Sequence, residues 1–424
     1  MAARERSGGQ GRTAFDVVVV GGGVAAGACV TTLRELGFGG SIAVACDEPH
    51  PPYTRPGLTK QVLRGEKPAS AALWRPPAWY DQHGVELLTG APATDLDPAE
   101  RRIDVAGRTL HYRSLVIATG AAPVSLDLGA GVGDRVHLLR TLADADRIRP
   151  HLGAGVRWLV IGGGFIGAEL AASARLTGSD VTLVLPEPFI LERAFGEPAG
   201  PWFHRRLHDR GVAIHAGSTI TSLTRAGDTV QALLADGTTV EVDHVCIGVG
   251  VRPNIALAAE AGLELAERGI ATDRYLLTRA PDVYAIGDVA AFDSVLHGRR
   301  ARIEHWDVAR AHGAHVAEQI ASGEPRAFAE LPYFFGTMGD WAFLEYVGTG
   351  TGRPVARGSL EGDDFAVAYV DGAGALAGLL TVARPADLEA ARELVASHAS
   401  VDPELVADAS VPLAECRLEA RATS

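Results

Sequence analysis

Short apolar runs alternate with amphipathic segments along most of the chain. Residues 15–20 and 158–161 have the continuous apolar pattern of buried strands. Each is followed by a segment with helical periodicity, residues 24–36 and 165–177, and then by a second strand, residues 41–46 and 180–185. This repeated strand–helix–strand order predicts two α/β units with parallel sheets.

Further strands are predicted at residues 114–120, 245–251 and 283–288, with a hairpin near 230–242 that turns at Asp236-Gly237. From about residue 328 the pattern changes to aromatic-rich strands followed by a helix near 385–398. This change indicates a separate small α+β domain at the C-terminal end.

Each first strand runs directly into the motif G-x-G-x-x-[GA]. A glycine at the first position permits the tight strand-to-helix turn, and the second lets the backbone approach a pyrophosphate. A small third residue lets the helix lie against the strand, and the helix N-terminus then attracts the phosphates. The motif positions are Gly21, Gly23 and Ala26 in the first copy and Gly162, Gly164 and Gly167 in the second.

One such motif alone is a weak signal, but two in this context predict two bound dinucleotides with electrons passing between them. The expected fold class is α/β, with two Rossmann-like (three-layer ββα) dinucleotide-binding domains and a C-terminal α+β domain.

An acidic residue after the second strand of each unit is expected to bind the ribose hydroxyls of its nucleotide. In the first unit this residue is Asp47, with Glu48 as the neighbouring candidate. In the second unit the usual position holds Leu185, so Glu187 is the candidate. The adjacent positions hold no arginine that could bind a 2′-phosphate, which favours NADH over NADPH.

Composition narrows the class of protein. A length of 424 residues favours two or three domains, and the net charge of −13 disfavours nucleic acid as a partner. No apolar run approaches the roughly 20 residues that span a bilayer, and no signal peptide precedes the first strand, so a cytoplasmic location is expected.

The four cysteines form no close pair, which argues against a redox-active disulfide or a zinc site. No other metal site is indicated. Cys46, beside the predicted ribose carboxylate, is the one candidate for a reactive thiol.

Several segments together resemble the FAD-dependent pyridine nucleotide-disulfide oxidoreductase superfamily. The resemblance is to its ferredoxin and rubredoxin reductases and to its apoptosis-inducing-factor-like branch. It extends from about residue 15 into the C-terminal domain. The matching segments are residues 51–60, 116–120, 162–170, 248–254, 285–290 and 302–306.

This resemblance implies a discontinuous FAD-binding domain over residues 14–123 and 244–326. An NAD-binding domain would be inserted at 124–243, and a C-terminal interface domain would cover 327–424. Residues 1–13 are expected to be a disordered tail.

The resemblance also assigns roles to individual residues. Lys60 and Glu169 would pair near flavin N5 and order the site of hydride transfer. Phe165 is either an aromatic gate over the flavin or a core residue. Besides the fingerprint positions, FAD contacts are implied at Asp47, Arg55, Lys60, Thr119, Gly120, Asp288, His305, Trp306 and Phe335, and NAD contacts at Ile166, Glu187 and Gly250.

Two departures from the family pattern concern the acceptor side of the reaction. The usual Phe-Trp-Ser-Asp segment is replaced within residues 332–338, where Phe335 keeps a ring but the indole, hydroxyl and carboxylate are lost. Gly57 stands where proline is usual.

Three functions remain open. The first is an NADH-dependent flavoprotein reductase of a ferredoxin- or rubredoxin-type iron–sulfur protein. The second is an NADH oxidoreductase that acts on oxygen, a quinone or a small biosynthetic metabolite. The third is an NADH-sensing protein that resembles the apoptosis-inducing factor.

The chain is expected to be a monomer or a homodimer. A cluster of arginines has two interpretations: it belongs to a solvated loop, or it forms a docking patch for an acidic ferredoxin. The residues concerned are Arg299, Arg300, Arg302 and Arg310.

Overall fold

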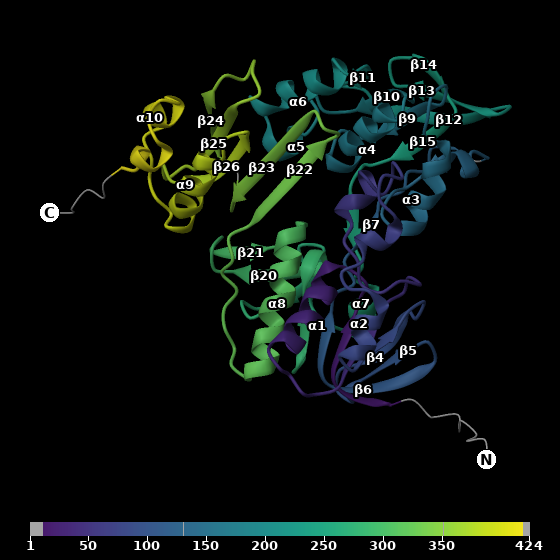
Figure 1. Ribbon diagram of the computed structural model, residues 1–424, viewed down its shortest axis with the longest axis vertical. Helices are drawn as coiled ribbons and strands as arrows, with labels where there is room; N and C mark the ends of the chain where they lie inside the picture. The colour runs from purple at the N-terminus through teal and green to yellow at the C-terminus, as the bar shows by residue number, and fades with distance from the viewer. Residues whose placement is uncertain (1–11, 130, 351, 419–424) are drawn as a thin grey trace.

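The computed structural model describes residues 12–129, 131–350 and 352–418. The predicted tail over residues 1–13 falls outside these ranges, except for Arg12 and Thr13. Figure 1 shows three bodies: a lower unit that contains α1 and α8, an upper teal unit, and a yellow-green C-terminal unit.

The first unit is built on a sheet with the strand order β3-β2-β1-β6-β5-β4, with β19 paired to β6. Strands β1, β2, β3, β6 and β19 run parallel, whereas β4, β5 and β6 pair antiparallel. These strands are β1 (Ala14–Val20), β2 (Ile42–Ala45), β3 (Val85–Leu88), β4 (Ala93–Asp97), β5 (Arg102–Val105), β6 (Arg108–Ile117) and β19 (Val283–Ala285).

Helices α1 (Val24–Glu35) and α8 (Trp306–Ser322) lie side by side on this unit (Figure 1). Their backbones approach so closely that a Cβ added at Gly313 would lie 2.3 Å from the carbonyl oxygen of Ala25. Two segments that lie far apart in the sequence are thereby joined in one layer. The smaller elements of this unit are α2 (Pro77–Gln82), α7 (Ala256–Glu260), β17 (Leu265–Ala266), β18 (Gly269–Thr272), β20 (Ala290–Ser294) and β21 (Arg299–Ala301).

The second unit repeats the parallel arrangement with the order β11-β10-β9-β15-β8, beside an antiparallel sheet β12-β13-β14. Its strands are β8 (Val136–His137), β9 (Arg157–Ile161), β10 (Asp180–Leu185), β11 (Val212–Ala216), β12 (Ile220–Ala226), β13 (Thr229–Leu234), β14 (Thr239–Val242) and β15 (His244–Ile247). Its helices are α3 (Leu142–Ile148), α4 (Phe165–Leu176), α5 (Glu192–Phe195) and α6 (Ala199–His208).

The second sheet extends beyond the sequence-based domain division, which placed residue 244 back in the FAD-binding domain. Strand β15 pairs with β9 and β8 of the second unit. The predicted strand at 245–251 also breaks after Ile247, and β16 (Val251–Pro253) pairs instead with β7 (Ala121–Pro123). We therefore propose that the boundary lies after Ile247, where the β7–β16 ladder connects the two units.

The C-terminal unit is an antiparallel sheet with the order β22-β23-β26-β25-β24, covered by α9 and α10. Together with the two parallel sheets, it confirms the predicted fold class. Its elements are β22 (Tyr333–Met338), β23 (Ala342–Gly348), β24 (Arg353–Gly358), β25 (Phe365–Val370), β26 (Leu376–Val382), α9 (Pro385–Ala396) and α10 (Pro403–Ala407).

A buried arginine fastens the C-terminal helices to this sheet. Arg357 on β24 pairs with Asp387 on α9 at 2.9 Å, and the two side chains are only 2% and 7% exposed. Its other guanidinium hydrogens reach the backbone carbonyls of Val406, Asp408 and Val411. Burial alone would raise the pKa of Asp387, but hydrogen bonds from Arg357 and Arg384 bring it below its usual value.

We expect Arg357→Ala to lower the free energy of unfolding by about 3–5 kcal/mol, because it leaves buried polar groups without their partner. The measurement is chemical denaturation followed by circular dichroism. Arg353→Ala, on the same strand but exposed, is the control and should stay within about 0.5 kcal/mol of the parent. Equal effects of the two substitutions would contradict this account.

Candidate active site

A cavity of about 930 Å³ lies where both fingerprint units and the C-terminal sheet meet. Most of the residues predicted to bind FAD or to take part in catalysis line it, which places them around one space. These residues are Gly21, Gly23, Asp47, Arg55, Lys60, Thr119, Gly120, Phe165, Glu169, Asp288, His305, Trp306 and Phe335, and Ile166, which was expected to contact NAD, lines the same cavity.

The first fingerprint loop forms one wall of the cavity. Gly21 has φ +137°, and a Cβ there would lie 2.1 Å from the carbonyl oxygen of Ala118, so only glycine fits. At Gly23, by contrast, no heavy atom of the described chain lies within 4 Å of an added Cβ. Gly23 is the N-cap of α1 without a side-chain cap, so the helix presents its N-terminal amides to open space. Ala26 lies behind this loop, fully buried in the core.

The second fingerprint has the same steric requirements. Gly162 has φ +110°, and its Cβ would lie 2.5 Å from the carbonyl oxygen of Gly248; a Cβ on Gly167 would lie 2.0 Å from the oxygen of Gly162. The cavity lining includes Phe165, Ile166 and Glu169 from helix α4 but not Gly162, Gly164, Gly167, Glu187 or Gly250. The two fingerprints therefore do not share one cavity, and only the start of α4 reaches the first.

Lys60 and Glu169 form a buried ion pair in the cavity wall. Lys60 Nζ lies 2.7 Å from Glu169 Oε1, and the side chains are only 11% and 9% exposed. Thr59 donates its hydroxyl to Glu169 Oε2 at 2.5 Å, and Lys60 also donates to the carbonyl of Pro56. Because Lys60 belongs to the first unit and Glu169 to α4, the pair joins the two nucleotide-binding units at the cavity.

Arg140 is a lining residue that the sequence reasoning missed. Its guanidinium pairs with Asp288 at 2.9 Å. The loop that carries Asp288 is itself held by His312, whose Nδ1 accepts the Gly287 N–H at 3.2 Å. Nothing local in the sequence relates Arg140 to Asp288, which is 148 residues away.

The two candidate ribose-binding carboxylates of the first unit, Asp47 and Glu48, have different partners in the structure. Glu48 accepts the Tyr53 hydroxyl at 2.7 Å and pairs with Arg55 at 3.3 Å. Asp47 is exposed at the cavity and receives only the backbone N–H of Glu48 among the described residues. Asp47 is therefore the carboxylate left free for a ligand.

Aromatic rings form the opposite wall of the cavity. His305 stacks on Phe334 with ring centroids 4.3 Å apart, and burial lowers the pKa of His305 to about 4, so its ring is neutral near pH 7. Phe165 contacts Phe334 edge to face at 5.4 Å. A Cβ added at Gly336 would lie 3.3 Å from the Phe165 ring. The Phe165 ring therefore both packs on the aromatic wall and borders the cavity.

These features fit a dinucleotide cofactor. The volume lies at the upper end of the ~300–1,000 Å³ found for ligand pockets. Within the described chain, Arg140 Nε and Trp306 Nε1 are buried without a hydrogen-bond partner, although both residues line the cavity. Buried donors of this kind are normally satisfied, so a ligand with acceptor atoms would complete them. The residues present therefore fit FAD, and the fold and site define a two-nucleotide oxidoreductase.

A family model described as pyridine nucleotide-disulphide oxidoreductase matches residues 15–313, and one described as reductase C-terminal matches residues 342–417. The chain is 34% identical to the ferredoxin–NAD(+) reductase component of a p-cumate 2,3-dioxygenase system from Pseudomonas putida, over 94% of this chain and 98% of that protein. It is 33% identical to a monodehydroascorbate reductase from Oryza sativa subsp. japonica, over 82% of this chain and 75% of that protein.

Among solved structures, the crystal structure of a covalent putidaredoxin reductase–putidaredoxin complex superimposes with a TM-score of 0.89 at 33% identity. The match covers 95% of this chain and 98% of that one. The chain belongs to the pyridine nucleotide-disulphide oxidoreductases. The predicted class, a flavoprotein oxidoreductase of the ferredoxin reductase type, is confirmed.

Despite the family name, the cysteines do not supply a reactive centre. All four are free and buried. Burial, with the charges of Asp47 and Glu48, raises the pKa of Cys46 to about 12, so the idea that Cys46 is a reactive thiol is wrong. None of the helices in the described ranges is both long and apolar enough to cross a bilayer.

The arginines predicted to dock a partner are largely compensated by neighbouring acids. Arg300 pairs with Asp293 at 2.9 Å, Arg302 pairs with Glu304, and Arg310 pairs with Asp307 at 2.9 Å. Arg299 is exposed and donates to the carbonyl of Arg300. The group is therefore close to neutral rather than a strongly basic patch.

We expect Arg140→Leu to raise the dissociation constant of FAD tenfold or more, because a hydrogen bond to a charged group contributes about 1.5–3 kcal/mol. The measurement is titration of the apoprotein with FAD by flavin fluorescence. Arg113→Leu, whose side chain is 82% exposed, is the control. An unchanged affinity in folded Arg140→Leu protein would remove Arg140 from the cofactor site.

Proposed function

We propose that this chain oxidises NADH and passes the electrons to a ferredoxin-type iron–sulfur protein. The observation that carries this proposal is the Lys60–Glu169 ion pair. It lies in the wall of the FAD-sized cavity, where helix α4 of the second nucleotide-binding unit enters. A donor nucleotide bound at the second fingerprint would therefore reach the same wall.

The protein groups have separable roles in this proposal. Bound FAD would supply the chemistry that converts a two-electron hydride donation into single-electron release. Lys60 places a positive charge at the wall, where it favours negative charge that develops in the cavity. Glu169 fixes the direction of the Lys60 ammonium, and the rings of Phe165, Phe334 and His305 restrict access of water.

Membership of the family implies FAD together with NAD(H) or NADP(H). The finer proposal, NADH, rests on Glu187 and on relatives whose names specify NAD(+). A carboxylate at the ribose accepts hydrogen bonds from both hydroxyls and repels a 2′-phosphate.

The proposal of a ferredoxin-type partner rests on a relative and on the exposed end of the cavity at Phe335. A relative was crystallised with putidaredoxin. In this chain Phe335 lines the cavity and is 40% exposed, so the site reaches the protein surface through the C-terminal sheet. Because the nearby arginines are paired with acids, we propose that they tune docking of a ferredoxin rather than dominate it.

We expect Lys60→Ala to slow reduction by NADH about 100-fold, at the lower end of the ~10²–10³ loss that follows removal of a preorganised electrostatic group. The measurement is anaerobic stopped-flow absorbance of the FAD-loaded protein at saturating NADH. Lys67→Ala is a matched control, because Lys67 is exposed and is the one other lysine in the sequence. Glu169→Gln should slow reduction as well, since it removes the charge that orients Lys60. Unchanged rates in both variants would exclude the pair from the reaction.

The altered segment at the cavity mouth favours a second candidate, turnover with oxygen or a small-molecule acceptor. Gly336 and Thr337 stand where the resembled family has serine and aspartate, and Phe165 packs so close to Gly336 that an added Cβ would lie 3.3 Å from its ring. Steady-state NADH oxidation with and without added ferredoxin separates the candidates. Faster turnover with ferredoxin supports the main proposal, whereas equal turnover in air supports the second. Slow turnover with NADH-dependent dimerisation would instead support a sensing role.

A further inference from the structure

Thr59 binds the carboxylate of Glu169 from the side opposite to Lys60. It ends the short helix Pro56–Thr59, directly before Lys60, and its side chain is buried. Its hydroxyl lies 2.5 Å from Glu169 Oε2 and 3.2 Å from the carbonyl of Pro56. A hydroxyl has one proton to donate, and a hydrogen bond to a carboxylate is the shorter and stronger of the two kinds. The Thr59 proton is therefore used by Glu169.

The two oxygens of Glu169 have different partners. Oε1 lies 2.7 Å from Lys60 Nζ and accepts the backbone N–H of Thr337 at 3.4 Å. Within the described part of the chain, Oε2 accepts a hydrogen bond from the Thr59 hydroxyl alone. Loss of this hydroxyl would leave a buried carboxylate oxygen without a donor, and such an oxygen turns toward other donors. The Lys60 ammonium would then lose the fixed direction that Glu169 gives it.

The backbone of Thr59 is held by the same helix that carries Glu169. Ser173 lies four positions after Glu169 on α4, so the two side chains share one face of the helix. The Ser173 hydroxyl donates to the Thr59 carbonyl at 2.6 Å and accepts a hydrogen bond from Arg64 Nη1 at 2.9 Å. Thr59 is therefore fixed at its hydroxyl and at its carbonyl by residues one helical turn apart.

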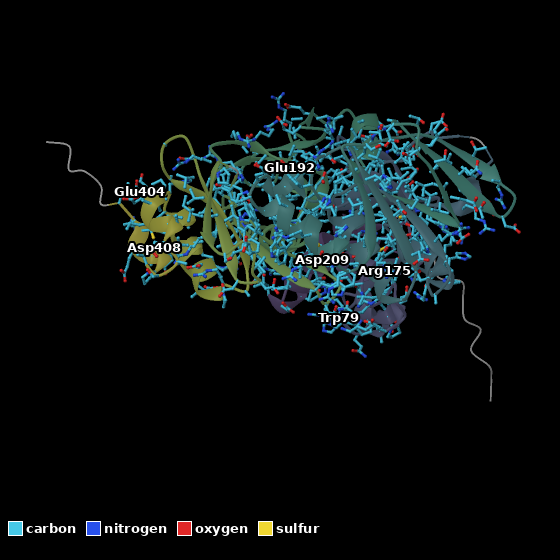
Figure 2. The ribbon with its side chains drawn as sticks, turned by 90° about the horizontal axis from the view of Figure 1, so that it is seen from above. Trp79, Arg175, Glu192, Asp209, Glu404 and Asp408 are labelled. Atoms are coloured by element: carbon cyan, nitrogen blue, oxygen red, sulfur yellow. The ribbon has the colours of Figure 1, made fainter. Side chains whose placement is uncertain are left out.

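The C-terminal end of α4 is tied to its own unit. Figure 2 labels Arg175, which lies in the last turn of this helix. Its guanidinium donates to the carbonyl of Ser179 at 2.5 Å and to the carbonyl of Arg210 at 3.2 Å. The helix is thus fastened to the second unit at this end, and along its length it meets the first unit through the polar contacts with Thr59, Lys60 and Arg64.

We propose that Thr59, held by Ser173, is a positioning residue for reduction by NADH: its hydroxyl fixes the Glu169 carboxylate, which in turn directs the Lys60 ammonium at the cavity. This inference rests on the proposed function. Although Thr59 lines the cavity, its one hydroxyl proton is used by Glu169, so the residue acts through its neighbours and not on a ligand.

The test uses the FAD-loaded protein and its variants Thr59→Val, Thr59→Ser and Ser173→Ala. Valine keeps the branched shape of threonine without the hydroxyl, whereas serine keeps the hydroxyl. The control is Thr381→Val in the C-terminal sheet, because Thr381 is also buried and its hydroxyl has no hydrogen-bond partner among the described residues.

Two properties are measured. Anaerobic stopped-flow absorbance gives the limiting rate of reduction and the NADH concentration at half saturation. Spectroelectrochemical titration without nucleotide gives the midpoint potential of the bound FAD. The second measurement reports the electrostatics of the cavity independently of turnover.

In Thr59→Val we expect the limiting rate to fall about tenfold, as for the loss of a hydrogen bond to a charged group. The half-saturating NADH concentration should stay within about twofold of the parent, because the change affects the reaction and not binding. The midpoint potential should become more negative, because a positive charge directed at the cavity favours the added electrons. Thr59→Ser should match the parent in both measurements, and Ser173→Ala should show smaller changes of the same sign as Thr59→Val.

An unchanged limiting rate or an unchanged potential in FAD-loaded Thr59→Val would overturn the inference, as would a loss that serine does not restore. An equal loss in Thr381→Val would overturn it too, because the effect would then belong to any buried valine. If Thr59→Val does not retain FAD, Ser173→Ala decides by the same criteria. Failure of the proposed function looks different: the parent protein would then be reduced by neither NADH nor NADPH, whereas the potential could still be measured.

Discussion

The buried ion pair between Lys60 and Glu169 is the constraint on which the arrangement of the two nucleotide-binding units depends. Each charge is almost completely removed from water, so neither is tolerable without the other. Because the lysine follows the short helix Pro56–Thr59 of the first unit and the glutamate lies on α4 of the second, the pair forms only when the units dock in one register. The Thr59 hydroxyl and the Ser173 hydroxyl, which donates to the Thr59 carbonyl at 2.6 Å, extend this contact. The cavity is thus shaped by an electrostatic requirement as well as by packing.

Local pattern was sufficient for the two parallel units, since their determinants lie within a few residues of each other. The valine run before Gly21 and the steric demand at Gly162 are both visible in the sequence, and strand β10 has the predicted bounds. The hairpin of β13 and β14 follows from Asp236-Gly237 in the same way. The local sequence pattern does not indicate that Lys60 and Glu169 are in contact, however, because 109 residues separate them. Only the resemblance to known reductases implied that contact.

What the sequence could not supply are pairings whose partners come from distant segments. Arg140 reaches Asp288 across the unit boundary, and β15 joins the second sheet because its pairing with β9 outweighs the glycine-interrupted pattern that runs on to β16. The charge balance of the arginine group, by contrast, depends on near neighbours in the sequence. Glu304 and Asp307 lie within three residues of the arginines with which they pair, so this compensation can be predicted from the sequence.

Two carboxylate–cation pairs in this chain, Lys60–Glu169 and Glu187–Arg193, differ in how far their side chains are buried. The extent of burial determines how firmly each pair is held. Lys60–Glu169 is enclosed, so its geometry is fixed and its charges act on whatever occupies the cavity. Glu187–Arg193 is exposed on the arginine side, and a pair this exposed contributes little stability. The enclosed pair therefore holds the two nucleotide-binding units in one arrangement, whereas the exposed pair leaves its arginine free to take other positions, because water replaces the lost contact.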